Sequence, residues 1–288
     1  MTIKLHIGAH KTATTHIQSL LEANQKILQD NHITLSTPST LRKNWLSNFL
    51  KFTHNQEKNL GETLNEKAPS NGIWLISEEN FSGIPYDFKI NHTGIYPNLK
   101  ARLQAFKKLF PNDKIELFFS IRSYDTYYRS LYLEVVRNNG YIPFNDFYKE
   151  DKFIHYSWVN VIESFTEVFN EQDITVWCYE NISSIMPKII NRLTETKEYE
   201  TYKKNYPINQ TRVSLSKQAI ETLASYSTIS QEESKQMVQT VYQQYSLEKG
   251  FQPYEPFDKN IQEFYQKKYS QDINFIKNKF LKINFLQG

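Results

Sequence analysis

The sequence has one cysteine, little net charge and no long apolar run. Cys178 alone cannot form a disulfide within the chain, and a single thiol cannot supply a zinc site of the usual spacing. No stretch of about 18 apolar residues occurs, and the N-terminus lacks the apolar core of a signal peptide. These absences predict a cytoplasmic protein with no transmembrane segment and no metal site.

The charge balance excludes one large class of partner. The chain has 34 Lys and Arg against 31 Asp and Glu, a net charge of +3, which is too small to favour nucleic-acid binding through bulk electrostatics. Any site for an anion must therefore be local. A hydrophobic content of 39% with 15% aromatic residues is typical of an ordinary folded protein, and we expect residues 1–288 to form a single domain.

The order of apolar patterns predicts the fold class. Apolar segments rich in Ile, Leu, Val, Phe or Trp predict four buried strands, at residues 2–8, 72–77, 114–122 and 173–179. Helical patterns separate them, so we expect an α/β fold with a mostly parallel central sheet and helices on both of its faces. After residue 180 the pattern is polar and helical, which predicts a helical cap (181–288) on an α/β core (1–180).

The segment between the first strand and the first helix is a candidate anion site. It reads Gly-Ala-His-Lys-Thr-Ala-Thr-Thr at residues 8–15. A loop at this place gathers several backbone N–H groups and the positive end of a helix, a geometry that binds phosphate or sulfate. Lys11 adds a charge, and Thr12, Thr14 and Thr15 add hydroxyl donors. The alternative is a tight turn in which the threonines only cap the helix.

This segment differs from the Walker A loop, GxxxxGK[ST], because its lysine follows Gly8 by three residues and has no glycine directly before it. It resembles instead the phosphosulfate-binding loop of sulfotransferases that use 3′-phosphoadenosine 5′-phosphosulfate (PAPS), especially the bacterial and glycan-modifying members. The resemblance implies a P-loop-like fold of three layers. It also implies that Lys11, Thr12, Ala13, Thr14 and Thr15 surround the phosphosulfate without a metal, and that Lys11 neutralises the leaving oxygen.

Ala13 departs from the pattern of that family, which normally has glycine there. If the position requires a positive φ, alanine costs roughly 1 kcal/mol, whereas in a helical conformation it costs nothing.

A 3′-phosphorylated nucleotide also needs a second cationic site. Arg122 ends the third predicted strand, and Ser130 follows eight residues later, about two helical turns or 11 to 12 Å along a helix. This pair is similar to the 3′-phosphate site of the family. The charged residues Asp125, Arg129, Glu134 and Arg137 of the same helix are expected on its solvated face.

Transfer to a hydroxyl requires a group that takes up the proton of the acceptor. The second strand delivers Ser-Glu-Glu-Asn-Phe (77–81) to the edge of the sheet where ligands bind in open α/β folds. By resemblance to the family, Glu79 is the base. Glu78 and His10 remain alternatives.

The resemblance implies a sulfotransferase that moves a sulfuryl group from PAPS to a hydroxyl, most readily that of a carbohydrate. The segment Asn209–Ser214 is similar to a short element of bacterial members that faces the donor or acceptor. Two other functions stay open. A P-loop-like kinase for a small molecule would bind Mg–ATP, and an inactive binding protein of the same fold would show no chemistry.

Overall fold

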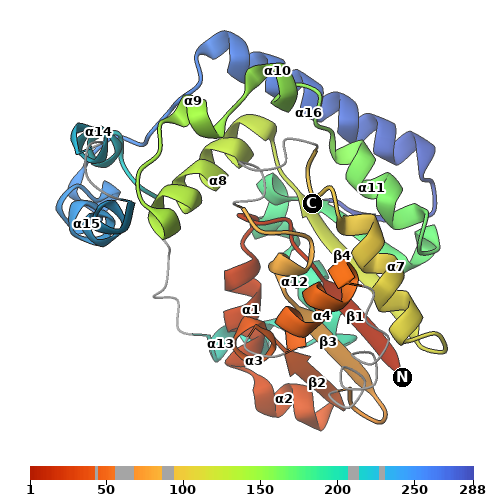
Figure 1. The fold of residues 1–288 in the computed structure, drawn as a ribbon. Coiled ribbons are helices and arrows are strands. Elements are labelled where there is room, and N and C mark those ends of the chain that lie inside the picture. The colour runs from red at the N-terminus through yellow and green to blue at the C-terminus, as the bar shows by residue number, and fades with distance from the viewer. Residues whose placement is uncertain (43–44, 56–67, 86–93, 207–213, 227–230) are drawn as a thin grey trace.

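The computed structural model describes residues 1–42, 45–55, 68–85, 94–206, 214–226 and 231–288. Its centre is a parallel sheet of six strands in the order β2-β3-β1-β4-β5-β6, enclosed between two layers of helices (Figure 1). The strands are β1 (Thr2–His6), β2 (Ile33–Ser36), β3 (Ile73–Ser77), β4 (Lys114–Ile121), β5 (Ile174–Cys178) and β6 (Asn284–Leu286). The predicted α/β fold is confirmed.

All four predicted strands are present, as β1, β3, β4 and β5. Two short strands extend the sheet beyond them, β2 at one edge and β6 at the other. β6 pairs in parallel with β5 and has only half-buried residues. The expectation of helices alone after residue 180 therefore misses one edge strand.

The helices divide between the two faces of the sheet. Apolar side chains of α1, α2, α12 and α13 pack on one face, and those of α4, α7, α8, α11 and α16 pack on the other. α14 and α15 pack against each other, and α15 packs on α8 (Figure 1). No helix within the described ranges combines the length and apolar character needed to cross a membrane. The helices are α1 (Thr14–Glu22), α2 (Gln25–Asp30), α3 (Pro38–Leu41), α4 (Trp45–Asn55), α7 (Leu99–Leu109), α8 (Tyr124–Asn139), α9 (Phe144–Phe147), α10 (Glu150–Phe153), α11 (Trp158–Thr166), α12 (Ile182–Thr194), α13 (Tyr199–Lys204), α14 (Lys217–Ser225), α15 (Gln231–Gln244) and α16 (Lys259–Lys279), with short 3₁₀ turns η1 (Glu79–Phe81), η2 (Glu171–Asp173), η3 (Tyr179–Asn181) and η4 (Leu247–Lys249).

The strand order gives a topological switch point, the β1–β4 crevice of open α/β folds, at the carboxyl ends of β1 and β4. After β1 the chain forms β2 and β3 on one side, and it then crosses to β4 on the other side of β1. The connections that leave these two neighbouring strands therefore run in opposite directions. Ligands of open α/β sheets bind at such a point. The pairing of the two strands continues past β1, because Ala9 N donates to Ser120 O at 3.0 Å and Ser120 N donates to Gly8 O at 2.7 Å.

His6 is a buried histidine on the face of the sheet covered by α1. Its Nδ1 lies 2.8 Å from Ser77 Oγ, and its ring stacks on Trp177. Burial lowers the pKa of His6 to about 4, against a smaller opposing effect of Glu79. Native His6 is therefore neutral at neutral pH.

We expect this histidine to make the fold sensitive to mild acid. Below pH 6.5 the unfolded chain binds a proton that native His6 does not accept until about pH 4, so the free energy of unfolding falls as the pH falls through this window. In His6→Asn the loss between about pH 7 and pH 5 should be smaller by about 2 kcal/mol, measured by urea unfolding. His155→Asn, which removes an exposed histidine, is the control. Equal pH dependence in wild type and His6→Asn would contradict the assignment.

Candidate active site

The loop between β1 and α1 has three residues with positive φ: Gly8 at 115°, Lys11 at 60° and Ala13 at 63°. Gly8 is required by space as well as by φ. A Cβ there would lie 3.1 Å from His10 N and 3.5 Å from Glu79 Cβ. The loop is therefore a tight, irregular turn whose backbone bends back toward the start of α1.

α1 begins at Thr14 with Ala13 in the N-cap position, and no side chain caps its first turn. The N–H groups at the start of a helix lack intrahelical acceptors, and the helix dipole makes this end positive. The Thr12 hydroxyl is directed into the loop and donates to Ala9 O at 2.7 Å. Thr14 is buried and Thr15 is exposed. The first turn of α1 can therefore receive an anion through backbone groups and the neighbouring hydroxyls.

The structure resolves the conformation of Ala13 as left-handed, with φ 63° and ψ 24°. Ala13→Gly should raise the free energy of unfolding by about 1 kcal/mol, because glycine adopts this conformation without the clash of a Cβ. Ala23→Gly is a matched control at the other end of α1, where φ is −65°. That change should destabilise the protein by about 0.5 to 1 kcal/mol. Chemical denaturation of both variants tests the pair, and destabilisation of similar size in both would contradict the prediction.

Arg122 joins the loop to the end of β4. Its Nη1 donates to Lys11 O at 2.6 Å, and its Nε donates to Thr126 Oγ1 at 3.0 Å. The guanidinium lies over the Tyr179 ring, 4.4 Å from the ring centre. The two segments that the sequence singles out as anion sites thus meet at the β1–β4 crevice.

One stripe of α8 continues from Arg122 toward the loop. Thr126 is one turn beyond Arg122, Ser130 is one turn further, and Glu134 follows after another turn, so the spacing of four places all of them on one face. Glu134 Oε2 lies 3.0 Å from Lys11 Nζ. The expectation of a solvated face is wrong for Glu134, whose side chain is 14% exposed and pairs with the loop, and for Asp125, which is buried and accepts from the Ser123 hydroxyl.

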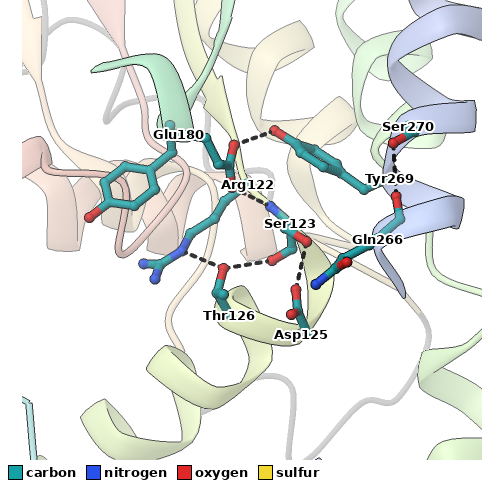
Figure 2. Close-up of a pocket in the computed structure, with 9 residues that line it drawn as sticks. Arg122, Ser123, Asp125, Thr126, Glu180, Gln266, Tyr269 and Ser270 are labelled. Atoms are coloured by element: carbon teal, nitrogen blue, oxygen red, sulfur yellow. Dashed lines mark hydrogen bonds between the residues drawn. The ribbon is translucent and has the colours of Figure 1, made fainter. Parts of the chain in front are cut away.

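A cavity of about 410 Å³ opens beside Arg122, between the ends of β4 and β5 and helix α16 (Figure 2). Glu180 connects two segments that line the cavity. One of its carboxylate oxygens accepts from Ser123 N at 2.8 Å, and the other accepts from the Tyr269 hydroxyl at 2.8 Å. Burial is the main cause that lowers the pKa of Arg122. Among the described residues no carboxylate is within ion-pair distance of this guanidinium. The lining residues are Arg122, Ser123, Asp125, Thr126, Tyr179, Glu180, Gln266, Tyr269 and Ser270.

Glu78 and Glu79 follow β3 at the same edge of the sheet but differ in their surroundings. Glu78 is 1% exposed and forms a two-pronged ion pair with Arg42, with contacts of 2.8 and 2.9 Å. Its Oε1 also accepts from Asn80 N at 2.9 Å. Burial raises the pKa of Glu78, partly offset by Arg42. The Glu78 carboxylate therefore stabilises the turn after β3.

Glu79 has the more accessible carboxylate, with its side chain 15% exposed. Oε1 lies 3.0 Å from Arg42 Nη2, and Oε2 accepts from Gln18 Nε2 at 3.0 Å. Burial alone would raise the pKa of Glu79, but the charge that His10 carries when protonated, hydrogen bonds and Arg42 outweigh it and bring the pKa below its ordinary value. Glu79 is therefore ionised at neutral pH.

Both ring nitrogens of His10 have partners. Nε2 lies 2.9 Å from Asn80 Oδ1, and Nδ1 lies 2.8 Å from the Tyr96 hydroxyl, which also accepts from His10 N. Burial lowers the pKa of His10. Because Asn80 Oδ1 accepts, the proton of the neutral ring is on Nε2 and Nδ1 accepts from Tyr96. His10 is therefore held in place as part of the loop.

Several residues of this site are not apparent from the sequence: Arg42, Tyr96 and Glu134 come from segments without a motif. For Glu134 alone there is a usable signal, its spacing of four from Ser130. The segment Asn209–Ser214 lies, except for Ser214, outside the described residues. Within the described ranges no group of three or more His, Cys, Asp or Glu side chains is placed to hold a metal ion.

No protein-family model matches the chain, and no curated protein gives a significant match. Among solved structures the chain is similar to the crystal structure of a sulfotransferase from Alicyclobacillus acidocaldarius. The two share 12% sequence identity with a TM-score of 0.44, over 69% of this chain and 83% of that chain. At this level of likeness, function has to be argued from the site itself.

Proposed function

We propose that this protein transfers a sulfuryl group from PAPS to an acceptor hydroxyl. The observation that carries the proposal is the contact between Arg122 and the backbone of Lys11, 2.6 Å long, across the β1–β4 crevice. It brings a loop suited to a 5′-phosphosulfate next to a desolvated guanidinium suited to a 3′-phosphate. A donor with anionic groups at both positions matches this pair of sites.

The proposed donor lies along the crevice. Its phosphosulfate is at the first turn of α1, contacted by Lys11, by backbone N–H groups of residues 12–15 and by the hydroxyls of Thr14 and Thr15. Its 3′-phosphate is bound by Arg122 with the hydroxyl of Ser130, which lies on the same stripe of α8. The cavity beside Tyr179 and Tyr269 offers space for the nucleoside. An anion at Arg122 would also compensate a half-buried cation, which favours binding there.

The proposed reaction is an in-line displacement at sulfur. The acceptor oxygen forms the new S–O bond, the bond from sulfur to the bridging oxygen breaks, and adenosine 3′,5′-bisphosphate leaves. Lys11 neutralises the charge that develops on the leaving oxygen. The acceptor proton passes to Glu79, the ionised and more accessible carboxylate of the edge, and then to solvent. Glu78 and His10 hold the surroundings of Glu79 in place. Glu78 orients Arg42, which contacts Glu79, and His10 fixes the loop.

Binding of the reaction product tests the donor. We expect isothermal titration calorimetry to show micromolar or tighter binding of adenosine 3′,5′-bisphosphate and much weaker binding of Mg–ATP. Tight Mg–ATP binding with none of the bisphosphate would instead support a kinase. A search for an acceptor then supplies PAPS and a panel of glycans, lipids and small alcohols and monitors the mass gain of one sulfuryl group. Glycans are the proposed class, and bisphosphate binding without transfer to any acceptor would favour the inactive binding protein.

A further inference from the structure

Lys11 contacts a carboxylate that is 123 positions away in the chain. Its Nζ lies 3.0 Å from Glu134 Oε2, and the two side chains are only 24% and 14% exposed. The other oxygen of Glu134 accepts from Asn138 Nδ2 at 3.2 Å, one turn further along α8. Because the pair is partly withdrawn from water, its attraction is stronger than that of an ion pair on an open surface.

The surroundings of Lys11 are positive. The first turn of α1 is the positive end of a helix, and the Arg122 guanidinium is bonded to the carbonyl of Lys11 itself. A lysine in this place is stabilised by a negative charge nearby. Glu134 supplies such a charge from the protein, at the ammonium group that an anionic ligand of the loop would also contact.

We propose that Glu134 is a positioning residue that holds Lys11 as an internal counter-ion and releases it to the incoming anion. The exchange of partners by Lys11 then sets the anion affinity of the loop. Wild-type affinity is lowered by the competing carboxylate, and in return Lys11 is kept directed toward the site. The inference rests on the proposed function only for the identity of the natural ligand, since any phosphate or sulfate group at the loop competes with Glu134 in the same way.

Removal of the competitor should therefore tighten binding. Glu134→Gln keeps the shape of the side chain and its contact with Asn138 but removes the charge. We expect its affinity for an anion at the loop to rise about fivefold, the size of effect that a partly exposed ion pair contributes. Glu163→Gln is the matched control, because it makes the same change in net charge at a surface pair with Lys279, the last residue of α16. Its affinity should equal that of the wild type.

The decisive measurement is the coupling between Glu134 and Lys11. Calorimetry with inorganic pyrophosphate and with adenosine 3′,5′-bisphosphate compares Glu134→Gln in two backgrounds, wild type and Lys11→Ala. If Glu134 acts through Lys11, the fivefold gain should disappear when Lys11 is absent. A general electrostatic effect of the carboxylate would give the same gain in both backgrounds, and this result would overturn the proposal. Thermal unfolding shows that each variant is folded.

The two probes separate this inference from the proposed function. Binding of pyrophosphate without binding of the bisphosphate would disprove the donor, and the comparison at Glu134 is then decided on pyrophosphate. Bisphosphate binding that is no tighter in Glu134→Gln would disprove the counter-ion role and leave the donor intact. If no variant binds either probe, the loop is not an anion site and both proposals are wrong.

Discussion

Replacement of Lys11 by alanine should lower the turnover number for sulfuryl transfer by about 10³-fold, while the affinity for adenosine 3′,5′-bisphosphate falls only about tenfold. The difference follows from the place of the charge. Lys11 contacts the ground-state donor as one of several groups, but the negative charge on the bridging oxygen develops fully only as the S–O bond breaks. An interaction that strengthens toward the transition state changes turnover more than binding. Transfer of labelled sulfuryl to an acceptor gives the rate, and calorimetry gives the affinity.

Two controls show whether a loss in Lys11→Ala is chemical. Lys26→Ala removes an exposed lysine that pairs with Asp30 on α2, and it should leave both quantities unchanged. Lys11→Ala also leaves Glu134 partly buried without this partner, so the double variant Lys11→Ala/Glu134→Gln, in which no such charge is left, should be more stable than Lys11→Ala. If the double variant regains stability but not turnover, the low turnover is caused by the missing ammonium group of Lys11 and not by lost stability. Unchanged turnover in Lys11→Ala would mean that the chemistry does not run through this loop.

The central part of the fold could be predicted because its signals are local. Each buried strand is rich in Ile, Leu, Val, Phe or Trp, and α8 has buried tyrosines at helical spacing, including Tyr124, Tyr127 and Tyr128. The edge strands carry no such signal. β6 spans three residues, none fully buried, and it is defined by its pairing with β5 and not by its own pattern. Short edge strands of this kind depend on the rest of the sheet.

The residues of the site also fall into those that the sequence predicts and those that it does not. The loop and Arg122 have positions fixed by the strand ends that precede them, so their meeting at the crevice follows from a parallel sheet. The partners of these residues come from elsewhere: Glu134 reaches Lys11 from the third turn of α8, Arg42 reaches Glu78 from the end of α3, and Tyr96 reaches His10 from the turn before α7. A charged side chain on a helix looks the same in sequence whether it faces water or a second charge. Only the packing of α8 against the loop decides which occurs.

Arg122→Ala should remove the preference of the site for a 3′-phosphate. In the wild type the ratio of affinities for adenosine 3′,5′-bisphosphate and 5′-AMP should be about 30- to 100-fold, the value of roughly 2 to 3 kcal/mol that hydrogen bonds from a desolvated guanidinium to phosphate contribute. In the variant this ratio should fall to within a few-fold of one. The ratio is the useful quantity because both ligands use the loop, so any loosening of Lys11 through its lost contact with Arg122 affects them alike.

Neighbouring variants distinguish the guanidinium from general charge. Arg122→Lys keeps the charge but loses the planar fork and the stacking on Tyr179, so its ratio should be intermediate. Ser130→Ala should reduce the ratio only several-fold, because a hydroxyl contributes about 1 kcal/mol. Arg129→Ala removes the adjacent arginine, which pairs with Glu255 and not with the stripe, and should leave the ratio unchanged. If the ratio is lost equally in Arg122→Ala and Arg129→Ala, the preference for a 3′-phosphate comes from the overall electrostatic field of α8 and not from a contact with Arg122. A ratio lost in Arg122→Ala alone would locate the 3′-phosphate at the end of β4, since the Arg122 side chain spans from the loop to the first turn of the helix.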